Sequence, residues 1–204
     1  PLTLKNLTFK AAPGVTVKGL WLSSTSAKTR LDLENITFED VTFTDKVVIG
    51  QDTSSYGLSK CTNITFDNCK FDLSGSREQY PDAIKRGGAS VSGTISEKEA
   101  VAYMDGLTVK NCEFANVRYA VYAGKARNTV VESCTFTNCS SYAIRIDDAA
   151  GKVAVNGNTI SKAAGVLTIN TVGNNYSTTD IQTDVVIKDN TATDMTCANG
   201  DVYI

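Results

Sequence analysis

An eight-residue pattern recurs along this chain and constrains the fold more strongly than any other feature. Mostly apolar residues stand at its first, third, sixth and eighth positions, as in LTVKNCEF at residues 107–114. Seven copies can be aligned, and they occupy residues 2–9, 36–43, 64–71, 107–114, 129–136, 153–160 and 185–192. The shortest spacings between copy starts, 22 and 24 residues, define the basic unit, and the longer spacings contain insertions.

Each copy predicts two short strands joined by a bend, because its apolar residues alternate with a period of two. The fifth position is always Asn, Asp, Ser or Gly, which tolerate turn conformations. A further short apolar strand precedes the pattern in most units, at residues 47–49, 120–122, 143–146 and 166–169. Three strands per unit predict an all-β parallel β-helix of about seven coils and three short sheets, in which each coil buries its inner face against its neighbours.

The sixth position should form one inward column, and it contains three of the six cysteines, Cys69, Cys112 and Cys134. We interpret these thiols as free core residues, since free cysteine behaves as a small hydrophobe. Disulfides remain the alternative. Zinc is disfavoured, because the chain has neither a C-x-x-C pair nor a histidine. Asn158 and Asn190 share the column, where an amide can bond to the next coil and form a ladder.

We predict one β-helix domain over residues 1–204 and interpret it as a piece of a longer protein, because the pattern already begins at residue 2. Insertions are expected at residues 72–105 and 170–184. Neither end has an obvious cap, so open strand edges are expected there. Contacts of these ends with a second copy or with a host protein follow as a prediction.

Composition narrows the classes of partner. The formal net charge is -2 and the pI is near 5.2, so the basic balance of a nucleic-acid-binding protein is absent. No apolar run is long enough to predict a membrane span. The absence of histidine removes the usual general base. Five N-x-S/T sequences stand mostly where the repeat requires Asn and Thr, so we interpret them as features of the fold.

The stretch SYAIRIDDAAGKVAVNGNTI at residues 141–160 resembles the pectate-lyase-like, right-handed parallel β-helix superfamily. The pattern of apolar and polar residues is similar over nearly the whole chain, and the residue types themselves are similar over this stretch. It implies a right-handed helix whose substrate lies along the outer face of the sheet formed by the strand before each eight-residue copy. The sequence departs from the enzymes of that superfamily at Asn156–Gly157, where the lyases have Asp-His, and it lacks their R-x-P-x-x-R segment.

Site residues follow from this resemblance. The candidate substrate-binding residues share an outward or strand-end position on that sheet, and they are Lys85, Tyr122, Thr168 and Asn170. Arg145 is the candidate catalytic residue, either as a base or as a clamp for a uronate carboxylate. Asp147 and Asp148 at the end of the same strand are candidate ligands for calcium.

Three functional hypotheses are compatible with these observations. The missing catalytic motifs favour a non-catalytic module of a secreted or cell-surface bacterial protein, carbohydrate-binding or adhesin-like, with a polysaccharide or surface glycan as its partner. The alternative is a polysaccharide lyase or hydrolase that acts on acidic polysaccharides, with calcium as its cofactor. The third is an assembly element, such as a fibre or tail component.

Overall fold

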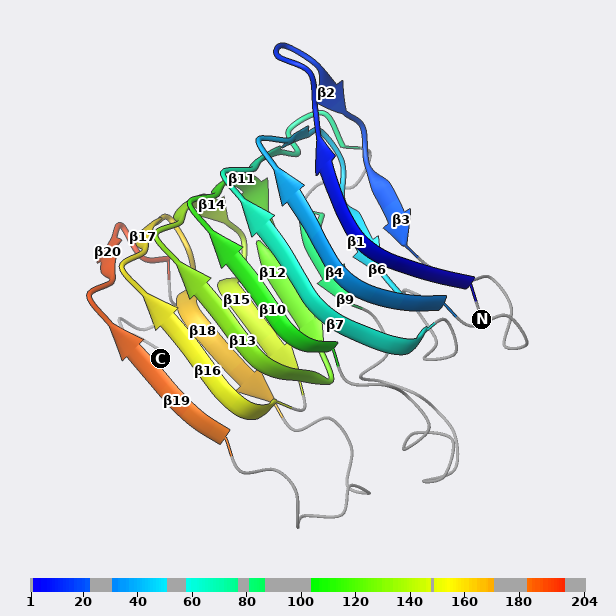
Figure 1. Cartoon of the computed structure of the whole chain (residues 1–204). Helices are drawn as coiled ribbons and strands as arrows, with labels where there is room; N and C mark the ends of the chain where they lie inside the picture. The colour runs from blue at the N-terminus through cyan, green and yellow to red at the C-terminus, as the bar shows by residue number, and fades with distance from the viewer. Residues whose placement is uncertain are drawn as a thin grey trace.

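The computed structural model describes residues 2–22, 31–50, 58–76, 81–86, 104–147, 149–170 and 183–196. Within these residues every regular element is a β-strand. The chain winds through seven coils, and successive coils place their strands side by side in the same three sheets (Figure 1). All neighbouring strands pair in parallel, as in β1 with β4 and β12 with β15. The predicted all-β parallel β-helix of seven coils and three sheets is confirmed. No helix that is long and apolar enough to span a membrane occurs in the described residues.

Three sheets run along the solenoid. Sheet A consists of β1 (Leu2–Lys10), β4 (Leu31–Glu39), β7 (Leu58–Asp67), β10 (Met104–Lys110), β13 (Ala126–Glu132), β16 (Ala150–Asn156) and β19 (Thr183–Lys188). Sheet B consists of β2 (Thr16–Val17), β5 (Thr42–Phe43), β8 (Lys70–Asp72), β11 (Glu113–Val117), β14 (Thr135–Cys139), β17 (Thr159–Ser161) and β20 (Thr191–Thr193). Sheet C consists of β3 (Leu20–Leu22), β6 (Val47–Ile49), β9 (Ile84–Arg86), β12 (Val121–Gly124), β15 (Tyr142–Asp147) and β18 (Gly165–Asn170).

Strand β9 lies inside the segment 72–105 that the sequence predicts to be an insertion. It pairs with β6 on one side and β12 on the other, so it belongs to the third coil of the solenoid. The remainder of that segment falls largely in residues 77–80 and 87–103, which lie outside the described residues, as does most of the predicted insertion at 170–184.

The bend between sheets A and B is made by residues in the left-handed backbone region. At the fifth position of the repeat φ lies between 51° and 63°, and the residues there are Asp40, Asn68, Asn111, Ser133, Gly157 and Asp189. Asn and Asp tolerate this conformation better than most residues. The side chains also join successive coils, since Asn68 Nδ2 donates to Asp40 Oδ1 at 2.7 Å and Asn111 Nδ2 to Asp67 Oδ1 at 2.9 Å. The turn role of this position is thereby explained.

A second asparagine ladder lies within the long strands of sheet A. Asn6, Asn35 and Asn63 all have φ near 54°. Asn35 Nδ2 donates to Asn6 Oδ1 and Asn63 Nδ2 to Asn35 Oδ1, each at 2.8 Å. Each of these residues opens an N-x-T sequence. The ladder gives all three asparagines a structural role.

The core contains columns of identical side chains. At the eighth position Phe43, Phe71, Phe114 and Phe136 are buried, and their rings stack with centroids 4.8, 4.8 and 5.2 Å apart. In-register parallel strands bring equivalent residues close together along the solenoid, so a favourable stack propagates from coil to coil. The aromatic column is therefore continuous over four coils.

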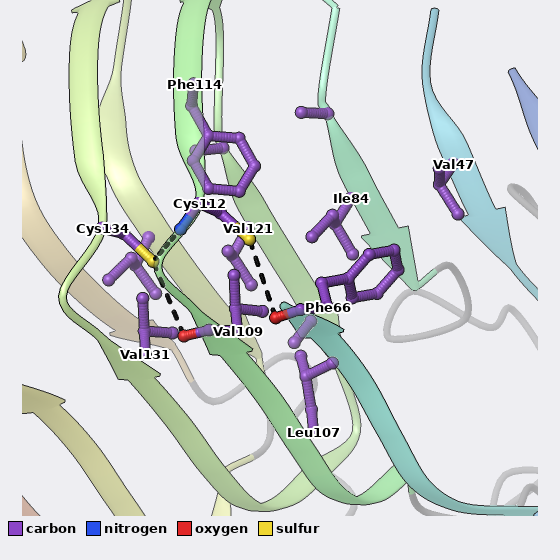
Figure 2. Packing of buried hydrophobic residues seen from close by; sticks show 14 of the residues in the cluster. Val47, Phe66, Ile84, Leu107, Val109, Cys112, Phe114, Val121, Val131 and Cys134 are labelled. Atoms are coloured by element: carbon purple, nitrogen blue, oxygen red, sulfur yellow. Dashed lines mark hydrogen bonds between the residues drawn. The ribbon is translucent and has the colours of Figure 1, made fainter. Parts of the chain in front are cut away.

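The sixth position forms a column of thiols beside these rings (Figure 2). The backbone N–H of Cys69 donates to Cys112 Sγ at 3.4 Å, and that of Cys112 to Cys134 Sγ at 3.4 Å. Each thiol in turn donates to backbone carbonyl oxygens, as Cys134 does to Glu132 at 3.2 Å. All five described cysteines are free and buried, which confirms the interpretation of these three as core residues; Cys197 lies outside the described residues.

Asparagine continues this ladder in the last two coils, as expected. Asn158 Oδ1 accepts from Cys134 N at 2.9 Å, and Asn190 Oδ1 accepts from Asn158 N at 2.9 Å. The amide nitrogens donate to carbonyl oxygens of the preceding coil, Asn158 to Val131 at 3.1 Å and Asn190 to Val155 at 2.7 Å. Thiol and amide therefore perform the same task at this position.

The alignment of the first copy is wrong. The repeat alignment places Leu7 in the sixth position and Phe9 in the eighth. In the structure Leu7 pairs with Ile36 and Phe9 with Phe38 on sheet A, which are the first and third positions of the second copy. Both LTL and LTF match the pattern, and the long strand β1 contains both. Leu7 and Phe9 are 36% and 38% exposed, whereas Ile36 and Phe38 are buried. The predicted contacts at the ends of the solenoid stay a prediction.

Candidate functional site

The outer face of sheet C brings four of the predicted site residues into one row. Lys85 pairs with Tyr122, Tyr122 with Arg145, and Arg145 with Thr168, on the adjacent strands β9, β12, β15 and β18 (Figure 1). The residues next to this row within the strands, such as Ile84 and Ile144, are buried in the core. Alternation along each strand therefore directs this row away from the core. Neighbouring members are about 4.8 Å apart along the solenoid.

Asp147 is the anchor of this row. Its carboxylate is fully buried and accepts hydrogen bonds from three residues. Arg145 donates through Nε to Oδ1 at 3.0 Å and through Nη2 to Oδ2 at 2.9 Å. The hydroxyl of Tyr122 donates to Oδ2 at 2.9 Å, and Asn170 Nδ2 donates to Oδ1 at 3.0 Å. Residues from three successive coils thus converge on one carboxylate.

Aromatic rings flank the Arg145 guanidinium. Its central carbon lies 4.7 Å from the ring centroid of Tyr122 and 5.5 Å from that of Tyr119, and Nη1 donates to the Tyr119 hydroxyl at 3.3 Å. Arg118 lies over the Tyr119 ring at 5.2 Å. Cation–π contacts of this kind add to the ion pair and orient the guanidinium groups. Sequence reasoning missed Tyr119 and Arg118, which stand in the turn before β12 rather than in a strand.

A second buried carboxylate, that of Asp82, lies two coils before Asp147. Asp82 accepts two hydrogen bonds from Arg118, from Nε at 2.8 Å and from Nη2 at 2.7 Å. Lys85 Nζ lies 3.4 Å from Asp82 Oδ2 and 5.7 Å from the Tyr122 ring centroid. Asp82 was also missed, because nothing in its local sequence predicts a buried carboxylate. The three ion pairs together form a continuous cluster of three cations, two carboxylates and two phenol rings.

Electrostatics keep the guanidinium groups of Arg118 and Arg145 and the phenol of Tyr122 protonated. Hydrogen bonding to Asp147 raises the pKa of Arg145 above its usual range, and hydrogen bonding to Asp82 does the same for Arg118. Burial and the neighbouring Asp147 carboxylate raise the pKa of Tyr122 to about 12. At neutral pH both guanidinium groups are charged and the Tyr122 hydroxyl is protonated. Each of these groups is therefore a donor.

The structure describes one of the two predicted calcium ligands, Asp147. Both oxygens of Asp147 already accept hydrogen bonds from protein donors, and Asp148 lies outside the described residues. In the described ranges no group of three or more potential metal ligands occurs. Thr168 Oγ1 donates to Asn170 Oδ1 at 3.4 Å, which places the last two candidate substrate-binding residues beside the cluster. The metal and substrate roles stay predictions.

Comparison with protein families gives a match over nearly the whole chain. The family described as right handed beta helix region matches residues 2–200. No curated protein and no solved structure matches the chain.

Proposed function

The chain belongs to the right-handed β-helix family, and we propose that it is a non-catalytic module that binds an acidic polysaccharide along the outer face of sheet C. A fold of this kind supports many functions, so the proposal depends on the site and not on the family. The single observation that carries it is the cluster around Asp147 and Asp82.

Binding is supported by the chemistry of the exposed groups. The Arg118 side chain is 48% exposed and that of Arg145 is 27% exposed, so both can reach a ligand from their fixed positions. Nε and Nη2 of each guanidinium already donate to Asp82 or Asp147, so a ligand carboxylate would bind the remaining N–H groups of Nη1 and Nη2. The rings of Tyr119 and Tyr122 add an apolar surface between the cations, and ligand sites commonly combine aromatic surface with a few oriented polar groups.

The same geometry argues against catalysis at this place. The raised pKa of Arg145 keeps its guanidinium protonated, which prevents it from abstracting a proton as a general base. The carboxylate of Asp147 is occupied by Arg145, Tyr122 and Asn170. A rigid arrangement of permanent donors suits recognition of an anion. A module that binds polysaccharide in this way would act outside the cell or at its surface.

The test is titration calorimetry with a galacturonate oligosaccharide, using variants that conserve charge. Arg118→Lys and Arg145→Lys keep the positive charge but lose the planar fork, so each should weaken binding by about tenfold, or about 1.4 kcal/mol. Arg127→Lys on sheet A is the matched control and should bind as the wild type does. Thermal unfolding of each variant checks that the fold is retained.

Two results would overturn the proposal. The first is an absence of saturable binding by the folded wild-type protein, with and without added calcium. The second is ultraviolet absorbance from unsaturated products of polygalacturonate that disappears in Arg145→Lys, which would identify a lyase instead.

A further inference from the structure

A groove lies beside the first strands of sheet C, where the first three coils turn from sheet B to sheet C. Its volume is about 760 Å³, within the range of small-molecule sites. Its walls come from the turn before β3, the turn before β6 and the turn after β8. Its principal lining residues are Lys18, Trp21, Thr44, Asp45, Lys46 and Ser76.

Trp21 is the most informative residue of this groove. Its side chain is 56% exposed, although tryptophan carries the largest apolar surface of any residue. It stands in β3 opposite Val48, a residue that is fully buried. The Lys46 ammonium lies 5.6 Å from the indole centroid. An exposed indole beside a cation offers a stacking surface and a charge at one place.

Backbone contacts join the turns that form the walls of the groove. Leu20 N donates to Lys46 O at 3.2 Å and Thr44 N donates to Val17 O at 2.9 Å, which join the first two turns. Asp45 Oδ1 accepts from the backbone N–H of Lys46 at 2.8 Å. A Cβ on Gly19 would lie 2.9 Å from Lys46 O, so only glycine allows the turns to approach this closely. Less free energy is spent on ordering side chains and loops when a ligand binds to a preorganised site.

The charges of the lining residues indicate which class of ligand fits the groove. Lys18 and Lys46 contribute two ammonium groups to the lining and Asp45 contributes one carboxylate, whose Oδ1 already accepts a backbone hydrogen bond. Thr44 and Ser76 contribute hydroxyl groups to the same lining. The arrangement suits a ring with an apolar face, several hydroxyl groups and an anionic substituent.

We propose that this groove is a separate binding site for an anionic sugar, which stacks on Trp21 and places its carboxylate or sulfate between Lys18 and Lys46. The site does not depend on the function proposed for the Asp147 cluster. Trp21 lies in the same outward row of sheet C as Lys85, because Trp21 pairs with Val48 and Val48 with Lys85. Lys85 is two coils, or roughly 10 Å, from Trp21, and Arg145 is four coils, or roughly 19 Å, from it at about 4.8 Å per coil.

The experiment uses the fact that Trp21 is the only tryptophan of the chain. Tryptophan fluorescence of the whole protein therefore reports on this groove alone. A galacturonate trisaccharide should change the emission saturably, and a neutral galactose trisaccharide should bind at least about tenfold more weakly. Lys46→Met and Lys18→Met should each weaken the response to galacturonate by about tenfold. The matched control Lys152→Met, on the outer face of sheet A, should leave the response unchanged.

Three outcomes would overturn the proposal: no saturable change in emission with the folded wild type, equal affinity for the charged and neutral trisaccharides, or equal losses in the Lys46 and Lys152 variants. Thermal unfolding identifies any variant that fails to fold, and Lys18→Met then tests the site independently. Calorimetric binding that is lost in Arg118→Lys without any change in the emission would refute this site and leave the proposed function standing. The reverse pattern would refute only the proposed function.

Discussion

Thr129 illustrates how a single polar atom can reduce stability inside this solenoid. Its side chain is buried, it pairs with Val153, and its hydroxyl oxygen has no hydrogen-bond partner within the described ranges. A buried polar group without a partner costs free energy on folding. Thr129→Val replaces the hydroxyl with a methyl group of similar size, so we expect the free energy of unfolding to rise by about 1 kcal/mol.

Urea denaturation measures this change. Thr108→Val is the matched control, because Thr108 lies on the outer face of the neighbouring strand and is only partly buried. The control should change the free energy of unfolding by less than about 0.5 kcal/mol. A loss of stability in Thr129→Val would show that the hydroxyl group has a stabilising partner.

The position of the site residues could be predicted from sequence, but their contacts could not. Alternation along β15 correctly directs Arg145 outward, and on the same reasoning Asp147 should also be exposed. Asp147 is instead fully buried, because Arg145 and Tyr122 fold over it. Side-chain packing of this kind depends on residues from three coils, so a local pattern does not contain it.

Between elements, the column that contains Cys69, Cys112, Cys134 and Asn158 stabilises the contact of one coil with the next. Asn158→Ala should lower the free energy of unfolding by roughly 3 kcal/mol, because it removes the side chain that accepts from the Cys134 N–H and donates to the Val131 carbonyl. Asn158→Cys should cost at least about 1 kcal/mol less, since a thiol makes both kinds of bond in the preceding coils. Urea denaturation of the two variants provides the comparison; equal losses would mean that the ladder does not contribute to stability.

The element-level prediction was correct where one register is possible and wrong where two are. In the copy at residues 107–114, a single alignment places Val109, Cys112 and Phe114 inward, and all three are buried. In β1 the segments LTL and LTF are both compatible with the pattern, and the pairing of Leu7 with Ile36 decides between them. Because that choice depends on the neighbouring strand, the sequence of β1 alone does not determine it.

For the molecule as a whole, buried thiols predict a loss of stability at alkaline pH. Burial raises the pKa of Cys61 and of Cys139 from 9.0 to about 12. Between these values the unfolded chain loses thiol protons that the folded protein retains, so the free energy of unfolding falls as pH rises through this window. Each thiol contributes a decrease of about 1.4 kcal/mol per pH unit.

Urea denaturation at several pH values from about 8 to 11 measures the slope. A double variant, Cys61→Ala with Cys139→Ala, should be less stable near neutral pH and should show a shallower alkaline decrease. An unchanged slope in the double variant would contradict the assignment of the effect to these thiols.

At this scale the repeat predicts the solenoid well and the groove around Trp21 poorly. The repeat determines the inward columns, which stack whatever the length of the turns between them. The groove is built from turns of unequal length in three coils, and its shape depends on contacts such as that of Gly19 with Lys46. Sequence analysis therefore predicts the scaffold of this protein more completely than its recognition surfaces.

The asparagine ladders outside the sixth-position column have a direction, and this has a consequence for biosynthesis. In six contacts the donating amide belongs to the later coil and the accepting oxygen to the earlier one, as in Asn35 to Asn6, Asn68 to Asp40 and Asn138 to Asn116. A nascent chain leaves the ribosome with its N-terminal coils first. Each new coil thus brings its amide donors to oxygen acceptors that are already in place, so the finished part of the solenoid acts as a template for the register of the next turn.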